Sequence, residues 1–209
     1  MAIPMVRRQI KNIAFFGFSD FPKSSTSYRE AFSVAQLLAK SGYTIVNGGG
    51  PGIMDAATQG AESVSGETVA ITFSPQDAPG FEGRYLANQV DKEIKTTNYI
   101  DRMFKLLEHA DCFIIFKGGS GTISELGATW VLAKLYYPHH KPFILYGEHW
   151  HKVIAVLKQT MKIRPVELKV FKIVDKETEV ISALVEFVKE MTTFDHSNCR
   201  ICTDKAFMT

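Results

Sequence analysis

Residues 111–130 place an apolar strand, a glycine-rich turn and the start of a helix in direct succession. The segment reads Asp-Cys-Phe-Ile-Ile-Phe-Lys-Gly-Gly-Ser-Gly-Thr-Ile-Ser-Glu-Leu-Gly-Ala-Thr-Trp. Glycines let the backbone approach a ligand closely, and the first N–H groups of a helix have no partner within the helix. Such a helix start is well suited to binding phosphate. The sequence therefore predicts a phosphate-binding turn here. Its residues are Gly118, Gly119, Ser120, Gly121 and Thr122.

A second strand, glycine turn and helix occur earlier, over residues 44–57. The glycines of this turn are Gly48, Gly49, Gly50 and Gly52. Neither turn is a Walker loop, because no Gly-Lys-Ser or Gly-Lys-Thr follows, and neither fits the spaced Gly-x-Gly-x-x-Gly dinucleotide fingerprint closely. Kinases, ATPases and ordinary dehydrogenases are thereby disfavoured. Glycines in such turns also serve close packing alone, but two of these turns in one small chain favour a ligand.

Strand and helix patterns alternate along the chain in the manner of a parallel sheet that is covered on both faces. The expected strands are 12–17, 43–46, 67–72, 92–96, the apolar run before Gly118, 142–146 and 170–174. The expected helices are 24–40, 52–64, 97–110, 122–136, 150–160 and 178–190. We predict an α/β fold with a Rossmann-like doubly wound parallel sheet in three α/β/α layers. It forms a single domain over residues 1–190, followed by a polar tail over 191–209 and interrupted by a long loop over 74–88.

Composition agrees with one compact intracellular domain. The chain has 209 residues, of which 45% are hydrophobic, and this suffices for one sizeable core. A formal charge of +2 gives no electrostatic reason to expect nucleic acid or a membrane surface as the main partner. The apolar run Ile13–Phe16 after the basic N-terminus is far shorter than a signal-peptide core, and no stretch approaches a membrane span. We expect a cytoplasmic protein.

The cysteines and histidines favour no metal site. Cys112 falls in an expected buried strand and is interpreted as a core residue. Cys199 and Cys202, with His196 before them, have the spacing of half a zinc site, but no second pair completes four ligands. Four further histidines have no spacing typical of a nucleophile or a metal set, and we expect them at the surface or an interface. They are His139, His140, His149 and His151.

The two turns together resemble the Lonely Guy (LOG) family of nucleoside 5'-monophosphate phosphoribohydrolases, long called lysine decarboxylases. The signatures of that family are Gly-Gly-Gly-x-x-Gly-x-Met and Pro-Gly-Gly-x-Gly-Thr-x-x-Glu. They correspond here to 48–54, which is one residue shorter than the first signature, and to 117–125. The opening Gly17-Phe18-Ser19 turn is also similar, and the resemblance spans residues 12–163. Arg102 matches the arginine of the family's Met-His-x-Arg-Lys stretch, without its histidine and lysine, and Lys117 replaces the motif's proline.

The resemblance implies an enzyme that releases free base and ribose 5-phosphate, without a cofactor. It implies that the 118–122 turn holds the 5'-phosphate and that Gly17, Ser19 and the first turn border the ribose and base. It also implies that Arg102 and Glu125 carry the chemistry. A carboxylate beside a phosphate site repels the anion, so Glu125 is expected to face ribose hydroxyls or a cationic transition state. An arginine is always protonated, so Arg102 is expected to orient the phosphate or stabilise the departing base.

A homodimer is implied too, in which the helices after the two turns pair and the partner completes the pocket. An aromatic-rich helix end fits either this interface or the core; its residues are Trp130, Leu135, Tyr136 and Tyr137. Asp55 fits either a contact to ribose hydroxyls or a stabilising acid in a first helical turn. Lys117 fits either a phosphate contact or solvent.

Two other classes of function stay open from the sequence. The first is a non-catalytic protein on the same scaffold that holds a nucleotide, or a pterin such as molybdenum cofactor, through its phosphate. The second is a decarboxylase that uses pyridoxal phosphate. It rests on the old family label alone, since no lysine lies in a motif that recommends a Schiff base.

Overall fold

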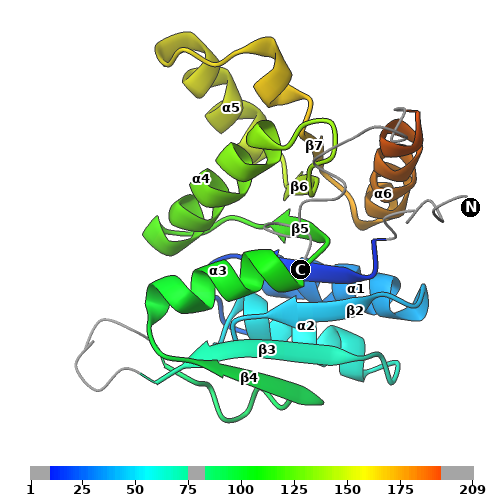
Figure 1. The fold of residues 1–209 in the computed structure, drawn as a ribbon. Helices are drawn as coiled ribbons and strands as arrows, with labels where there is room; N and C mark the ends of the chain where they lie inside the picture. The colour runs from blue at the N-terminus through cyan, green and yellow to red at the C-terminus, as the bar shows by residue number, and fades with distance from the viewer. Residues whose placement is uncertain (1–9, 75–82, 194–209) are drawn as a thin grey trace, which may run out of the picture.

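The computed structural model describes residues 10–74 and 83–193, and strands alternate with helices along the chain (Figure 1). The strands are β1 (Asn12–Phe16), β2 (Thr44–Asn47), β3 (Thr68–Phe73), β4 (Lys92–Thr96), β5 (Cys112–Ile115), β6 (Phe143–Tyr146) and β7 (Phe171–Val174). The helices are α1 (Thr26–Lys40), α2 (Ile53–Glu62), α3 (Tyr99–His109), α4 (Ser120–Leu135), α5 (His149–Thr160), the 3-10 helix η1 (Pro165–Leu168) and α6 (Glu177–Thr192). The described residues thus contain every strand and helix that the sequence pattern predicts.

All seven strands form one parallel sheet in the order β4-β3-β2-β1-β5-β6-β7. The order reverses between β1 and β5, which pair directly, for example at Ala14 and Phe113. In an open parallel sheet, this switch point leaves a crevice beyond the C-terminal strand ends, where ligands bind. The predicted Rossmann-like, doubly wound, three-layer single domain is confirmed.

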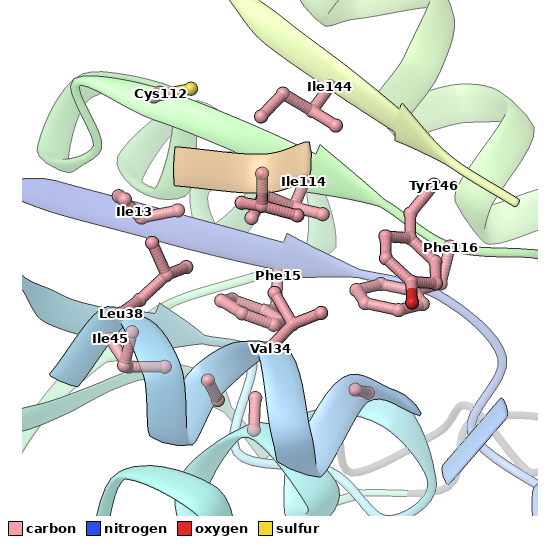
Figure 2. Packing of buried hydrophobic residues seen from close by; sticks show 14 of the residues in the cluster. Ile13, Phe15, Val34, Leu38, Ile45, Cys112, Ile114, Phe116, Ile144 and Tyr146 are labelled. Carbon is pink, nitrogen blue, oxygen red and sulfur yellow. The ribbon is translucent and has the colours of Figure 1, made fainter. Parts of the chain in front are cut away.

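The two faces of the sheet support two separate cores, because successive strand side chains point to opposite sides. On one face, Ile13 and Phe15 of β1 pack with Val34 and Leu38 of α1 and with apolar residues of α2 and α6 (Figure 2). On the other face, Phe16 packs with residues of α3, α4 and α5. Helices α3 and α4 accordingly lie on the opposite side of the sheet from α1 and α2 (Figure 1).

Some element boundaries differ from those predicted. Helix α4 begins at Ser120 rather than Thr122, so its first turn includes part of the glycine-rich segment.

Strand β4, at the sheet edge, is largely exposed and carries Lys92, Glu93 and Lys95, and such charges discourage pairing with another chain.

Two expectations about single residues have opposite outcomes. Cys112 is fully buried in β5, as predicted. His140 was expected at the surface or an interface, and this is wrong: within the chain itself it is only 5% exposed, and its ring lies tilted against that of Tyr137, with centroids 5.3 Å apart. Within the described ranges, no helix is long and apolar enough to cross a membrane. His196, Cys199 and Cys202 lie outside the described residues, as does the 75–82 part of the expected loop.

Candidate functional site

A cavity of about 570 Å³ opens at the switch point, beyond the C-terminal ends of β1, β2 and β5. Nine of its lining residues are predicted site residues. They are Gly17, Ser19, Gly48, Arg102, Gly119, Ser120, Gly121, Thr122 and Glu125. The remaining lining residues are Phe15, Phe16, Phe18, Asp20, Met54, Tyr99 and Ser124. The chain therefore brings three of its turns and the N-terminal parts of α3 and α4 to one hollow.

Four predicted site glycines do not line this cavity: Gly49, Gly50, Gly52 and Gly118. Three belong to the first glycine turn, whose polar groups bind other parts of the protein. The Gly49 carbonyl accepts from the Tyr85 N–H at 3.1 Å, and the Gly50 carbonyl accepts from Asn88 Nδ2 at 2.9 Å. The end of the loop after β3 thus folds back onto this turn.

Gly52 holds the first turn against the β1 turn. Its φ is +65°, and a Cβ there would lie 2.3 Å from the Phe18 carbonyl oxygen. That same oxygen accepts from the N–H of Ile53, the first residue of α2, at 3.1 Å. At this position glycine is therefore required by the fold, because both the positive φ and the close contact exclude a side chain.

The start of α2 already has a carboxylate of its own. Asp55, in the first turn, is 2% exposed and accepts from the Tyr28 hydroxyl at 2.5 Å. Burial and this carboxylate both raise the pKa of Tyr28, so the phenol stays a donor. Lys23 lies 3.6 Å from the same carboxylate oxygen. Asp55 does not line the cavity, which favours its interpretation as a first-turn acid over a contact to ribose.

The second glycine turn is arranged differently. No side chain caps α4, whose N-cap is Gly119, and its first turn contains no acidic residue. By contrast, Ser25 caps α1 and Asn98 caps α3 through their side chains. The leading N–H groups of a helix have no intrahelical partner, and they carry the positive end of its dipole. The start of α4 is therefore the better place in this cavity for an anion.

Gly119 and Gly121 leave room for a ligand at this turn. A Cβ on Gly119 would have Phe18 ring atoms nearest, at 3.9 Å, and one on Gly121 would have the Tyr99 hydroxyl nearest, at 3.7 Å. Gly118, in contrast, supports Thr122, since a Cβ there would lie 2.0 Å from the Thr122 hydroxyl oxygen. Gly119 and Gly121 thus leave the cavity free, while Gly118 is needed for packing.

Arg102 contributes a buried cation to the cavity. The residue is 4% exposed, and its Nε and Nη2 donate to the carbonyls of Ile71 at 3.1 Å and Gly48 at 3.2 Å. Its Nη2 also lies 3.5 Å from Met54 Sδ, and its guanidinium carbon lies 6.0 Å from the centre of the Phe73 ring. These contacts fix the guanidinium at the C-terminal end of the sheet.

The cavity has a carboxylate on each of two elements. Glu125 is half-buried in the second turn of α4, and Asp20 is exposed in the turn after β1. Ser19 Oγ donates to Asp20 Oδ1 at 3.3 Å. Glu125 lies in the same wall as the Gly119–Thr122 turn, as its place in the second glycine motif predicted.

Sequence reasoning missed several lining residues, among them Phe18, Asp20 and Tyr99. A signal for the first two was present, because they flank Ser19 in a turn that follows a buried strand at the switch point. Tyr99 had no such signal, since it is the first residue of α3 and an aromatic ring there is equally typical of simple packing. Its ring meets Phe73 edge to face, with centroids 6.1 Å apart.

Lys117 is exposed and does not line the cavity. Its charge acts instead on His149, at the start of α5: burial is the main cause that lowers the pKa of this imidazole, and Lys117 lowers it further. Of the two interpretations left open by the sequence, solvent thus fits better than a phosphate contact.

Comparison with known proteins agrees with this geometry. An uncharacterised protein from Archaeoglobus fulgidus is 36% identical over 101 residues, which make up 48% of this chain and 62% of that protein. The solved structure of TM1055 superposes with a TM-score of 0.63 at 23% identity, over 85% of this chain and 99% of that one. A molybdenum cofactor binding protein from Rippkaea orientalis gives a TM-score of 0.64 at 21% identity, over 86% and 98% of the two chains. These two structures share the fold.

The model of one family, the SLOG cluster4 family, matches residues 11–165, a span that contains both glycine turns, Arg102 and Glu125. The resemblance that the two glycine motifs carry is thereby confirmed. The chain belongs to the SLOG cluster4 family, within the LOG-like superfamily.

Proposed function

We propose that this protein hydrolyses the N-glycosidic bond of a nucleoside 5'-monophosphate and releases free base and ribose 5-phosphate. The observation that carries the proposal is that Arg102 and Glu125 line the same cavity as the uncapped N-terminus of α4. A cation, a carboxylate and an anion-binding helix start thus meet in one hollow.

The cavity suits a mononucleotide in size and charge. Its volume of about 570 Å³ lies within the usual range for small-molecule and cofactor sites. The 5'-phosphate would bind at the N–H groups of Ser120, Gly121 and Thr122, where the fold offers no acid and no capping side chain. Arg102 adds a permanent positive charge that favours binding of the anion.

Glu125 lies at a useful distance from that phosphate site. It is five residues beyond Ser120 on the helix, and at about 1.5 Å per residue this places it roughly 7 Å further along the axis. That is about the reach from a 5'-phosphate to the anomeric carbon of the ribose. A carboxylate there stabilises the positive charge that develops on the ribose ring as its bond to the base breaks.

The reaction would then proceed by attack of water. The bond between the anomeric carbon and the base nitrogen breaks, and its electron pair leaves with the base. A water oxygen bonds to the anomeric carbon, Glu125 accepts a proton from that water, and the base takes up a proton. Arg102 is unsuited to give that proton, so its part is to hold the Gly48 turn and the anion in place.

The test is base release from a panel of nucleoside 5'-monophosphates, followed by chromatography. We expect free base and ribose 5-phosphate from at least one of them, and we expect Glu125→Gln to lower the rate by roughly a hundredfold or more. Asp20→Asn is the matched control, because it removes the other carboxylate of the cavity, and it should have a smaller effect. If Glu125→Gln is folded and releases base at the wild-type rate, the proposed mechanism is wrong.

The second candidate is a carrier that binds a nucleotide or molybdenum cofactor without turnover. Its supporting observation is that two donors of Arg102 already bind main-chain carbonyls, as expected of an arginine that stabilises the fold and takes no part in a reaction. The fold shared with the molybdenum cofactor binding protein points the same way. Tight binding of a phosphate ligand with no base release from any nucleotide of the panel would favour this candidate.

A pyridoxal phosphate enzyme has less support. The cavity lining drawn from the described residues contains no lysine that would form a Schiff base.

We further propose that the protein is a homodimer that pairs through α3 and α4. Helix α2, which follows the first glycine turn and was expected in this interface, is buried along almost its whole length on the other face of the sheet. Three apolar side chains of α4 are 64%, 52% and 57% exposed; they are Ile123, Val131 and Leu135. They are spaced by multiples of four residues, so they form one stripe along the helix. Gly127 lies in the same stripe, with no atom within 4 Å of a Cβ built on it, and leaves room for another backbone.

The adjoining helix α3 extends this apolar surface. Ile100 and Phe104 are each 54% exposed, and Ser124 of α4 contacts Met103 of α3 at 3.6 Å. Both helices also line the cavity, so a second copy on this surface would lie at its mouth. An apolar face of this kind is unusual on a monomer, which is why we assign it to a partner copy.

The oligomeric state can be tested by sedimentation velocity. We expect a dimer for the wild type and a monomer for Val131→Glu. Val185→Glu is the matched control: Val185 is 60% exposed on α6, which packs on the opposite face of the sheet, and this variant should stay dimeric. A monomeric wild type at micromolar concentration contradicts the proposal.

A further inference from the structure

We propose that Phe18 forms an aromatic wall of the cavity on which a planar ring of the ligand stacks. The inference rests on the proposed function, in that the ligand's phosphate is taken to bind at the start of α4. It goes further by naming the side chain that recognises the flat heteroaromatic ring of that ligand.

The main chain of Phe18 is fixed between the two glycine turns. Its N–H donates to the Lys117 carbonyl at 3.2 Å, directly before the second turn. Its carbonyl accepts from the Ile53 N–H at 3.1 Å, directly after the first turn. The Cα of Phe18 is therefore held by both turns at once, and the direction of its side chain is set by the same contacts that shape the cavity.

The ring of Phe18 is exposed where the ligand would lie. The residue is 37% exposed. The rings of Phe18 and Phe21 meet edge to face, with centroids 5.3 Å apart and planes at 74°, and this contact helps to fix the orientation of the Phe18 ring. The ring atoms nearest to Gly119 lie 3.9 Å from the position of a Cβ built on it. The ring thus stands beside the proposed phosphate site and borders the cavity.

An exposed, oriented aromatic ring beside an anion site is suited to a ligand with two parts. The helix start binds the charged phosphate, and the ring offers an apolar face that a flat base or pterin covers with little loss of side-chain freedom. A sugar phosphate without a base would use the first contact only. Phe18 is therefore assigned to recognition of the ring, and not to the phosphate or to catalysis.

The experiment compares two kinds of ligand, nucleotides and ribose 5-phosphate, in one background. Glu125→Gln is used throughout, so that nucleotides stay intact, and the dissociation constants of AMP, GMP, UMP and ribose 5-phosphate are measured by calorimetry. Phe18→Leu should weaken binding of the tightest nucleotide by about tenfold, as expected for loss of one stacked base, and leave ribose 5-phosphate within about twofold. Phe32→Leu is the matched control: Phe32 of α1 packs on the other face of the sheet and does not line the cavity, and its replacement should change neither value.

Phe18→Trp gives an independent readout. It keeps a stacking surface, so nucleotide affinity should be retained, and AMP should quench the added indole fluorescence while ribose 5-phosphate should not. If Phe18→Leu weakens both ligands equally, the side chain only supports the turns and the inference is overturned while the proposed function stands. If the parent protein binds neither nucleotide nor ribose 5-phosphate, the proposed function and this inference are overturned together.

Discussion

Replacement of Gly48 by alanine tests whether Arg102 and the first glycine turn form one unit. A Cβ at this position would lie 1.7 Å from Arg102 Nη2 and 2.6 Å from its guanidinium carbon. The next contact, Met54 Sδ at 2.9 Å, belongs to a flexible side chain. The methyl group and the guanidinium occupy the same space, so Arg102 must leave its position.

The cost can be worked out from the contacts that are lost. A hydrogen bond from a charged donor contributes about 1.5–3 kcal/mol, and Arg102 loses at least the one to the Gly48 carbonyl. Overpacking of a buried site costs about 1–3 kcal/mol more. We therefore expect Gly48→Ala to destabilise the protein by about 3–5 kcal/mol. For a domain of this size that corresponds to a fall in Tm of roughly 6–20 °C.

A double-mutant cycle isolates the contact. Arg102→Met fills much of the space without the guanidinium, so in that background Gly48→Ala should cost less than about 1 kcal/mol. The coupling free energy between the two sites is then about 3 kcal/mol, measured by urea unfolding followed by circular dichroism. If Gly48→Ala shifts Tm by less than about 2 °C, or costs the same with and without Arg102, the guanidinium is not held in the way described.

Two further predictions concern the second turn and the pH dependence of stability. Gly119→Ala should leave Tm within about 2 °C of wild type, because φ is −97° and the added methyl group would make only ordinary van der Waals contact with the Phe18 ring. It should weaken binding of ribose 5-phosphate about tenfold by obstructing the start of α4, and an unchanged affinity would contradict the assignment of the phosphate to this helix start. The lowered pKa of His149 means that the folded state favours the neutral imidazole, so the unfolded chain takes up the proton first as pH falls below about 6.5 and stability falls with it. His149→Gln should therefore reduce the slope of Tm against pH between pH 5 and 7. The slope should not vanish, because burial also lowers the pKa of His109. An unchanged slope would contradict the lowered pKa of His149.

Most of the sheet was predictable because its strands, apart from the charged edge strand β4, are largely apolar and buried. Runs such as Ile13–Phe16 and Cys112–Ile115 are buried on both faces, and the helices between them have clear spacing. Only a few such arrangements are open to a chain with this alternation, and the right-handed crossover rule reduces them further. The order of the strands within the sheet was not predicted and comes from the structure.

The contacts that each polar side chain makes were much harder to predict. Arg102 stands on a helix beside Met103, and nothing in the local pattern shows that its side chain reaches Gly48, 54 residues away. His140 is a polar residue in a short loop, but the fold closes over it. Such contacts depend on side-chain directions that neighbouring elements fix only after the sheet has formed. Periodicity therefore locates elements better than it locates polar partners.

The two glycine turns show why a glycine motif alone does not identify an anion site. Both follow a buried strand and open a helix, and both are rich in glycine. At α2 the helix start has Asp55 in its first turn, and Gly52 is required by contact with the Phe18 carbonyl. At α4 the first turn has no acid and no side chain caps it, and a Cβ on Gly119 or Gly121 would meet no atom closer than 3.7 Å. The difference lies in what occupies the helix start, because glycine makes either arrangement possible. The first turn's glycines are thus explained by packing and by Arg102, whereas Gly119 and Gly121 of the second turn are explained by the ligand that we propose.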